Sequence, residues 1–189
     1  MGAASARSIG LCLVGFMGAG KSSVGRALGE QLNWDFEDLD DRIERLEGRS
    51  IAQIFRASGE AAFRRAESAA LAEVLVEMRG GAAKILALGG GAFVQKQNAA
   101  ALKRAGLPVI FLDAPVEELW RRCRLQAEEA GAVRPLLRST DEFRKLYEAR
   151  RSGYLQASLT IDTAGRKVKA IATEIAETIG VRPRKTKQS

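Results

Sequence analysis

The sequence predicts a three-layer α/β fold in which a five-stranded parallel sheet carries helices on both faces, within a single domain of residues 1–189. Short apolar segments alternate with segments of helical periodicity, and no linker or repeat interrupts them. The first apolar segment is continuous rather than alternating, which is typical of a strand buried on both faces. Glycines and acidic residues follow directly after strands, at the sheet edge where such folds bind ligands.

The strand predictions rest on short apolar runs and on the residues that end them. In chain order the runs are residues 9–14, 34–39, 84–88, 108–112 and 159–162. Gly15 ends the first run, acidic residues end the second, and three glycines follow the third. Each run is short enough to be a strand rather than a helix.

The helix predictions rest on 3.6-residue periodicity and on residues that mark helix ends. In chain order they cover residues 21–32, 42–46, 60–78, 98–104, 115–130, 141–151 and 168–179. Gly48 stops the second, and Ser50 caps a further short helix that turns Phe55 inward and closes at Gly59. Pro115 suits the first turn of its helix. The connection at 131–138 is predicted to be mobile.

Composition excludes several kinds of chemistry. The chain has no histidine, so Ser-His triads, histidine acid–base catalysis and His-ligated zinc are excluded. The net charge of +7, part of it in the basic tail 181–189, suits either nucleic acid or an anionic nucleotide with an anionic co-substrate. No apolar run approaches the roughly 20 residues of a membrane helix. The first residues lack the apolar segment of a secretory signal, so we expect a cytoplasmic protein.

A phosphate-binding loop is the strongest motif. Residues 15–22, GFMGAGKS, satisfy GxxxxGK[ST] between a predicted strand and a predicted helix. The backbone amides and Lys21 would hold the β- and γ-phosphates, and the Ser22 hydroxyl would be a Mg²⁺ ligand. GTPases, ATPases and kinases share this motif, so it leaves the acceptor open. The residues expected to bind the nucleotide here are Gly15, Gly18, Ala19, Gly20, Lys21, Ser22 and Ser23.

Asp38 and Asp40 follow the second predicted strand. Alternation along a strand would place both carboxylates on one side, two residues apart. One could hold the magnesium ion through water, while the other accepts the proton of an attacking hydroxyl. Acids in the helical turn that follows have a structural explanation, because the helix dipole favours them.

Four further features bear on the acceptor. The spacing of Arg64 favours exposed ion pairs with Glu60 and Glu67, and its alternative role is to bind a substrate carboxylate. The triplet 89–91 is costly in backbone entropy, which favours close approach to a ligand. Arg134 lies on the mobile connection, where it could close over the transferred phosphoryl group. Arg150 ends a helix, where the dipole alone favours a cation.

Together these motifs resemble the shikimate kinase family from residue 15 to about residue 163, which implies a P-loop kinase fold with a lid at about 123–138. GFMGAGKS is the usual wording of that family's phosphate loop, and Gly48-Arg-Ser-Ile-Ala-Gln-Ile-Phe55 and Phe63-Arg64-Arg65 follow its pattern closely. The family's proline before Tyr154 is replaced by Ser152-Gly153, which predicts a looser helix end at Arg150.

The resemblance implies phosphoryl transfer from ATP to shikimate, giving 3-phosphoshikimate on the route to aromatic amino acids. It implies that Asp38 serves the magnesium ion with Ser22 and that Asp40 is the substrate-side base. Lys21 and Arg134 would carry phosphoryl charge, and Arg122 is the expected adenine-side residue. The implied shikimate ligands are Asp40, Arg64, Gly89, Gly90, Gly91 and Arg150.

Other functions remain open on the sequence. A gluconate kinase would also bind a carboxylate and hydroxyls, although the glycine triplet and the two aspartates argue against it. A nucleoside monophosphate kinase lacks support because no second base pocket is evident. A non-catalytic sensor of the same fold would tolerate loss of Lys21, Asp38, Asp40 or Arg134, and all four are present. We expect a monomer that binds neither nucleic acid nor membrane.

Overall fold

The computed structural model describes residues 10–129 and 139–182. Five parallel strands form one sheet in the order β2-β3-β1-β4-β5. The strands are β1 (Gly10–Val14), β2 (Asp35–Asp38), β3 (Lys84–Ala87), β4 (Val109–Asp113) and β5 (Leu159–Asp162). The fold class predicted from the alternation of segments is confirmed.

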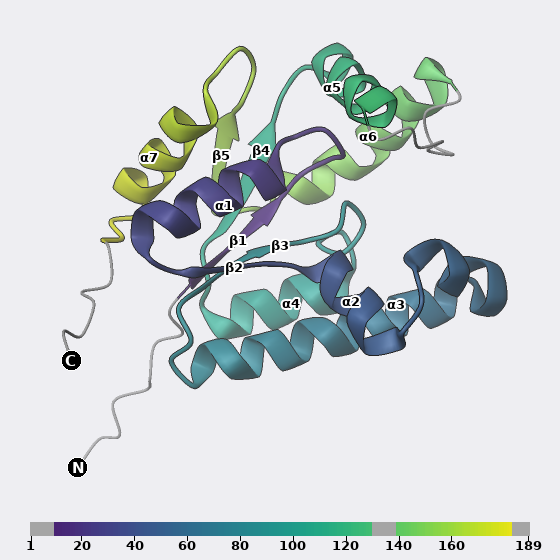
Figure 1. The fold of residues 1–189 in the computed structure, drawn as a ribbon, viewed down its shortest axis with the longest axis horizontal. Coiled ribbons are helices and arrows are strands. Elements are labelled where there is room, and N and C mark those ends of the chain that lie inside the picture. Colours follow the sequence, from purple (N-terminus) through teal and green to yellow (C-terminus); the bar gives the residue numbers. More distant parts are fainter. Residues whose placement is uncertain (1–9, 130–138, 183–189) are drawn as a thin grey trace.

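Helices cover both faces of the sheet (Figure 1). They are α1 (Lys21–Leu32), α2 (Leu39–Glu47), α3 (Ile51–Arg79), α4 (Lys96–Ala105), α5 (Val116–Glu129), α6 (Thr140–Tyr154) and α7 (Val168–Thr178). Helices α1 and α7 pack together on one face, and α3 packs with α4 on the other. Within the described ranges, no helix has the length and apolar character needed to cross a membrane.

The central strand explains why this sheet forms the core. All five residues of β1 are buried between helices, as the continuous apolar run predicts. Parallel neighbours β3 and β4 lie on its two sides. The loops after β1 and β3 therefore leave the same edge of the sheet, and helix α2 begins beside them at the right of Figure 1.

The end of β2 differs from the prediction, whereas the predicted break at Gly59 is found. Strand β2 ends at Asp38, and Leu39 already belongs to α2, because the Asp38 side chain caps that helix. The helix expected to close at Gly59 does break there, since Gly59 has φ 76° and ψ 174° inside α3. Phe55 is not turned into the core as expected. Its side chain remains 39% exposed and packs against Phe63, with ring centroids 4.7 Å apart.

The predicted lid is only partly described. Residues 123–129 continue helix α5, and residues 130–138, including Arg134, lie outside the described residues, as does most of the basic tail.

The helix end that carries Arg150 is well packed. Helix α6 runs on to Tyr154, and a Cβ on Gly153 would lie 2.6 Å from Val94 Cγ1. The structure therefore does not show the looser end predicted from the missing proline.

Candidate active site

The phosphate loop joins β1 to α1 and directs Lys21 back over its own backbone. Gly20 precedes the helix with φ 91°, a left-handed conformation that glycine adopts without steric cost. The Lys21 ammonium donates to the carbonyl oxygens of Gly15 at 2.9 Å and Phe16 at 3.1 Å. Burial is the main influence on its pKa, which is lowered. The cation is thus held inside the loop, where a phosphate would be bound.

Asp38 connects the loop to helix α2. Its Oδ2 accepts from the Ser22 hydroxyl at 3.0 Å, and its Oδ1 accepts from the Asp40 backbone amide at 3.1 Å. The two aspartates do face one cavity, but not because they alternate along a strand. Asp38 is the N-cap of α2 and Asp40 lies in the first turn, so the helix start brings the carboxylates to the same side.

Asp40 is the most perturbed carboxylate of the cavity. Its pKa is raised to about 6, chiefly by burial and secondly by the neighbouring Asp38, while Lys21 opposes the shift. Among the described residues no donor to its carboxylate is found, so its charged form lacks the hydrogen bonds that lower a pKa. A carboxyl that titrates this close to neutral pH is suited to exchange a proton with a substrate hydroxyl.

The glycine triplet meets the predicted substrate residues directly. A Cβ added to Gly89 would lie 2.5 Å from Asp40 Oδ1, and a Cβ added to Gly91 would lie 2.8 Å from both terminal nitrogens of Arg64. At Gly90 it would lie 3.3 Å from Arg150 Nη1. Gly89 and Gly91 therefore cannot carry a side chain unless the charged group beside each of them moves. The loop after β3 therefore packs against all three groups through its backbone.

Arg64 makes both ion pairs that its spacing predicts and also lies on the cavity wall. It pairs with Glu60 at 3.2 Å and with the buried Glu67 at 2.9 Å, as the helical spacing predicts. Its side chain also lines the cavity with Gly91. Burial is the largest influence on the pKa of Glu67, which is raised despite the bond from Arg64. The ion pairs therefore hold the guanidinium in place at the cavity wall.

Two adjacent arginines at the end of α6 point to different partners. Arg150 lines the cavity and lies 5.9 Å from the centre of the Phe16 ring. Arg151 instead donates to Tyr147 at 3.1 Å and pairs with Asp113 at 3.4 Å. One turn beyond Arg150, the buried Tyr154 hydroxyl donates to the carbonyl of Gly90. Helix α6 is thereby attached to the glycine loop beside Arg150.

The cavity has a volume of about 460 Å³ and lies beside the phosphate loop. One wall is apolar, formed by Ile51, Phe55 and Phe63 from α3. Sequence reasoning did not assign these residues to the site, although their place beside the break at Gly59 was a usable signal. The predicted site residues on its wall are Gly18, Gly20, Lys21, Ser22, Ser23, Asp38, Asp40, Arg64, Gly89, Gly90, Gly91 and Arg150.

Arg122 lines a second pocket, which shares Gly18, Gly20 and Ser23 with the first. It donates to Thr163, at 3.0 Å to the hydroxyl and 2.8 Å to the carbonyl, and pairs with Glu118 at 2.8 Å. Ala19 lines this second pocket as well. The pocket is continuous with the loop that would hold the phosphates, which is compatible with an adenine-side role for Arg122.

A phosphate loop that opens onto a small cavity with two arginines and a raised-pKa carboxylate defines a P-loop kinase acting on a small molecule. The shikimate kinase family model matches residues 17–180. Shikimate kinase of Cereibacter sphaeroides is 40% identical over 174 residues, covering 90% of this chain and 82% of the relative. That of Symbiobacterium thermophilum is 42% identical over 171 residues, covering 88% of this chain and 94% of the relative. This chain belongs to the shikimate kinase family.

Solved structures agree with this assignment. Shikimate kinase from Acinetobacter baumannii in complex with shikimate matches with a TM-score of 0.80 and 35% identity. The match covers 92% of this chain and 94% of that chain. The family and the kinase activity predicted from the motifs are confirmed. The individual site residues stay predictions.

Proposed function

We propose that this enzyme transfers the γ-phosphoryl group of ATP to the 3-hydroxyl of shikimate, giving ADP and 3-phosphoshikimate for aromatic amino acid synthesis. The observation that carries the proposal is the convergence of Asp40, Arg64 and Arg150 on the glycine loop, beside the phosphate loop. Shikimate offers one carboxylate and three hydroxyls, and this cavity offers two guanidinium groups, backbone groups and a carboxylate in the same small volume.

The two arginines would bind the substrate carboxylate. Arg64 is held by Glu60 and Glu67, and Arg150 approaches from the opposite element, α6. Charge-assisted hydrogen bonds from two directions fix the orientation of a planar carboxylate. The apolar wall of Phe55 and Phe63 suits the carbon skeleton of the ring. The ring hydroxyls would then face the glycine loop and Asp40.

Asp40 would orient the attacking hydroxyl and accept its proton. It must be ionised to do so, and at neutral pH a carboxyl with a pKa of about 6 is mostly ionised. Lys21, at the base of the phosphate loop, would stabilise charge on the transferred phosphoryl group. Arg134 is proposed to add charge from the lid, although it lies outside the described residues.

A magnesium ion fits the oxygen atoms that the site presents. The Ser22 hydroxyl and the Asp38 carboxylate lie 3.0 Å apart, and hydroxyl and carboxylate oxygens are the ligands that Mg²⁺ prefers. Ser22 and Asp38 would hold the ion, Asp38 through water, and bound Mg²⁺ would neutralise phosphate charge. It stays a prediction that the enzyme is monomeric and cytoplasmic and that it binds neither nucleic acid nor membrane.

The test is ADP release by the purified protein with ATP and Mg²⁺, measured in a coupled assay with shikimate or gluconate as acceptor. We expect release that depends on shikimate and collapses in Asp40→Asn, while nucleotide binding is retained. Turnover with gluconate in place of shikimate would overturn the substrate assignment. A folded, ATP-binding protein with no turnover on either acceptor would favour a sensor role.

A further inference from the structure

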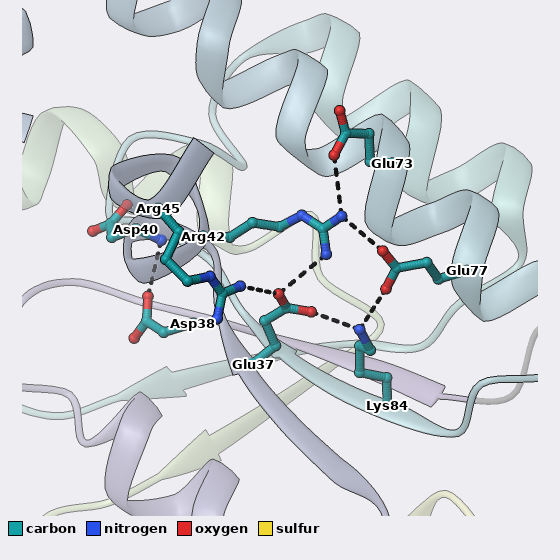
Figure 2. Close-up of polar contacts among 8 residues, drawn as sticks. All are labelled: Glu37, Asp38, Asp40, Arg42, Arg45, Glu73, Glu77 and Lys84. Carbon is teal, nitrogen blue, oxygen red and sulfur yellow. Dashed lines mark hydrogen bonds and ion pairs between the residues drawn. The ribbon is translucent and has the colours of Figure 1, made fainter. Parts of the chain in front are cut away.

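Six charged side chains lie together at the junction of α2, α3, β2 and β3, behind the two aspartates (Figure 2). Ion pairs of 2.6 to 3.1 Å join them. None of them is among the residues that line the cavity in the described ranges. This set, called the α2 network below, consists of Glu37, Arg42, Arg45, Glu73, Glu77 and Lys84.

Arg42 is the residue of the α2 network that ties helix α2 to two other elements. Its guanidinium donates to Glu37 of β2 at 3.1 Å, and to Glu73 and Glu77 of α3 at 3.1 Å and 2.7 Å. The Arg42 side chain is only 12% exposed, as is that of Glu37. These bonds hold its pKa above the ordinary value, so the guanidinium stays charged. Helix α2 is therefore fastened to both β2 and α3 through one side chain.

The geometry links this fastening to the proposed base. Glu37 and Asp38 are neighbours on β2, so their side chains leave opposite faces of the strand. Asp40 and Arg42 are two residues apart on α2, which places them about 200° apart around the helix axis. Figure 2 shows both aspartates to the left of Glu37, Arg42, Lys84, Glu73 and Glu77, with the Arg45 side chain reaching Glu37 from beside them. Each of the two aspartates thus has a network residue on the opposite side of its strand or helix.

We propose that Arg42 is a positioning residue for phosphoryl transfer, fixing α2 so that Asp40 stays against the glycine loop. The proposal rests on the proposed function of Asp40 as the base. Asp40 has little freedom, because Gly89 leaves no room for a side chain between them. A small rotation of α2 would move the carboxylate away from the hydroxyl that it must meet, and a displacement of about 1 Å can cost about a hundredfold in rate.

Loss of Arg42 should disturb this position without unfolding the protein. Lys84 also pairs with Glu37 and Glu77, at 2.6 Å each, so β2 and α3 remain joined through β3. Arg45 gives a matched control, because it lies on the same helix and pairs with the same Glu37 at 2.9 Å. It differs in being 67% exposed and in making this single ion pair within the described residues.

The experiment compares kcat and KM of Arg42→Met, Arg42→Lys and Arg45→Met, with folding checked by circular dichroism at the assay temperature. Both methionine variants lose one positive charge. We expect kcat of Arg42→Met to fall at least about tenfold with KM for ATP little changed. Arg45→Met should stay within about twofold of the unchanged enzyme. Arg42→Lys should recover part of the lost kcat, since an ammonium can still bond Glu37 and Glu77.

A charge effect is separated from a positional one by adding Glu77→Gln to Arg42→Met, which restores the net charge. We expect kcat to remain low in this double variant, and its recovery would overturn the proposal. Equal kcat in Arg42→Met and Arg45→Met would also overturn it. If Arg42→Met does not fold, Arg42→Lys is compared with Arg45→Met instead. Equal kcat values in these two variants would refute the positioning role. Absence of shikimate-dependent turnover in the unchanged enzyme would instead refute the proposed function.

Discussion

Replacing Asp40 by asparagine is expected to stabilise the folded protein at neutral pH while removing its activity. The Asp40 carboxylate is partly buried beside Asp38, and Lys21 offsets only part of the cost of its charge. Asparagine has nearly the same shape and carries no charge. The substitution therefore removes an electrostatic cost that the folded state bears and the unfolded state does not.

The size of the effect follows from the shift in pKa, from 3.8 to about 6. A carboxyl whose pKa is raised by folding does not affect the free energy of unfolding at a pH below its ordinary pKa. As the pH rises from the ordinary pKa toward the folded pKa, the carboxyl lowers the free energy of unfolding. The shift of about 2.2 pH units corresponds to about 3 kcal/mol at about pH 7.5. At about pH 4.5 the same relation gives about 1 kcal/mol.

Urea unfolding at these two pH values measures the difference in free energy of unfolding between Asp40→Asn and the unchanged protein. With a urea m-value of about 2 kcal/mol/M, the midpoint of Asp40→Asn should exceed that of the unchanged protein by about 1.5 M at the higher pH. The excess should shrink to about 0.5 M at the lower pH. Any fixed cost of packing asparagine cancels in the comparison. Asp41→Asn is the control, because Asp41 is an exposed carboxylate in the same helical turn and should give no such gain.

An advantage of Asp40→Asn that is the same at both pH values, or a variant that is less stable at the higher pH, would refute the raised pKa of Asp40. An advantage that does not change with pH would mean that folding leaves the pKa of Asp40 at its ordinary value, and a variant less stable at the higher pH would mean that the folded protein stabilises the carboxylate. An equal gain in Asp41→Asn would attribute the effect to the general charge of the helix start.

Three further predictions concern catalysis. Arg64→Met and Arg150→Met should each raise KM for shikimate about 30-fold or more with KM for ATP little changed, because each removes a charge-assisted bond of about 2 kcal/mol. Exposed Arg65→Met is the control in the same steady-state assay. Gly91→Ala should also raise KM for shikimate, since its Cβ would lie 2.8 Å from the Arg64 guanidinium, and circular dichroism should show an intact fold. The kcat/KM for shikimate should fall about tenfold per pH unit below about pH 6, as Asp40 becomes protonated.

Each of these has a result that would contradict it. Unchanged KM for shikimate in both arginine variants would exclude the carboxylate clamp. A Gly91→Ala enzyme with normal KM would show that the guanidinium moves aside without loss. A flat profile of kcat/KM down to about pH 5 would exclude Asp40 as a base that must be ionised, given its raised pKa.

The fold was predictable because its strongest signals are local. A continuous apolar run followed by GFMGAGKS determines a buried strand, a turn and a helix start within 14 residues, 9–22. Segment alternation then leaves a parallel sheet as the simple arrangement. The break at Gly59 was also predictable, because it needs only one residue with the backbone freedom of glycine.

The site was less accessible to sequence reasoning where it depends on distant contacts. The spacing of Asp38 and Asp40 was consistent with a strand, and only the capping bond from the Asp40 amide to Asp38 shows that a helix places them. The contact between Gly91 and Arg64 joins two elements whose proximity no periodicity encodes. The same holds for Arg42, whose bonds to Glu73 and Glu77 span more than 30 residues.

We propose that this enzyme phosphorylates the 3-hydroxyl of shikimate. Phosphorus NMR of the product formed from ATP, Mg²⁺ and shikimate tests it most directly. We predict one phosphate ester that couples to the proton on C3, formed in step with ADP. Inorganic phosphate alone, or an ester on another hydroxyl, would contradict the account.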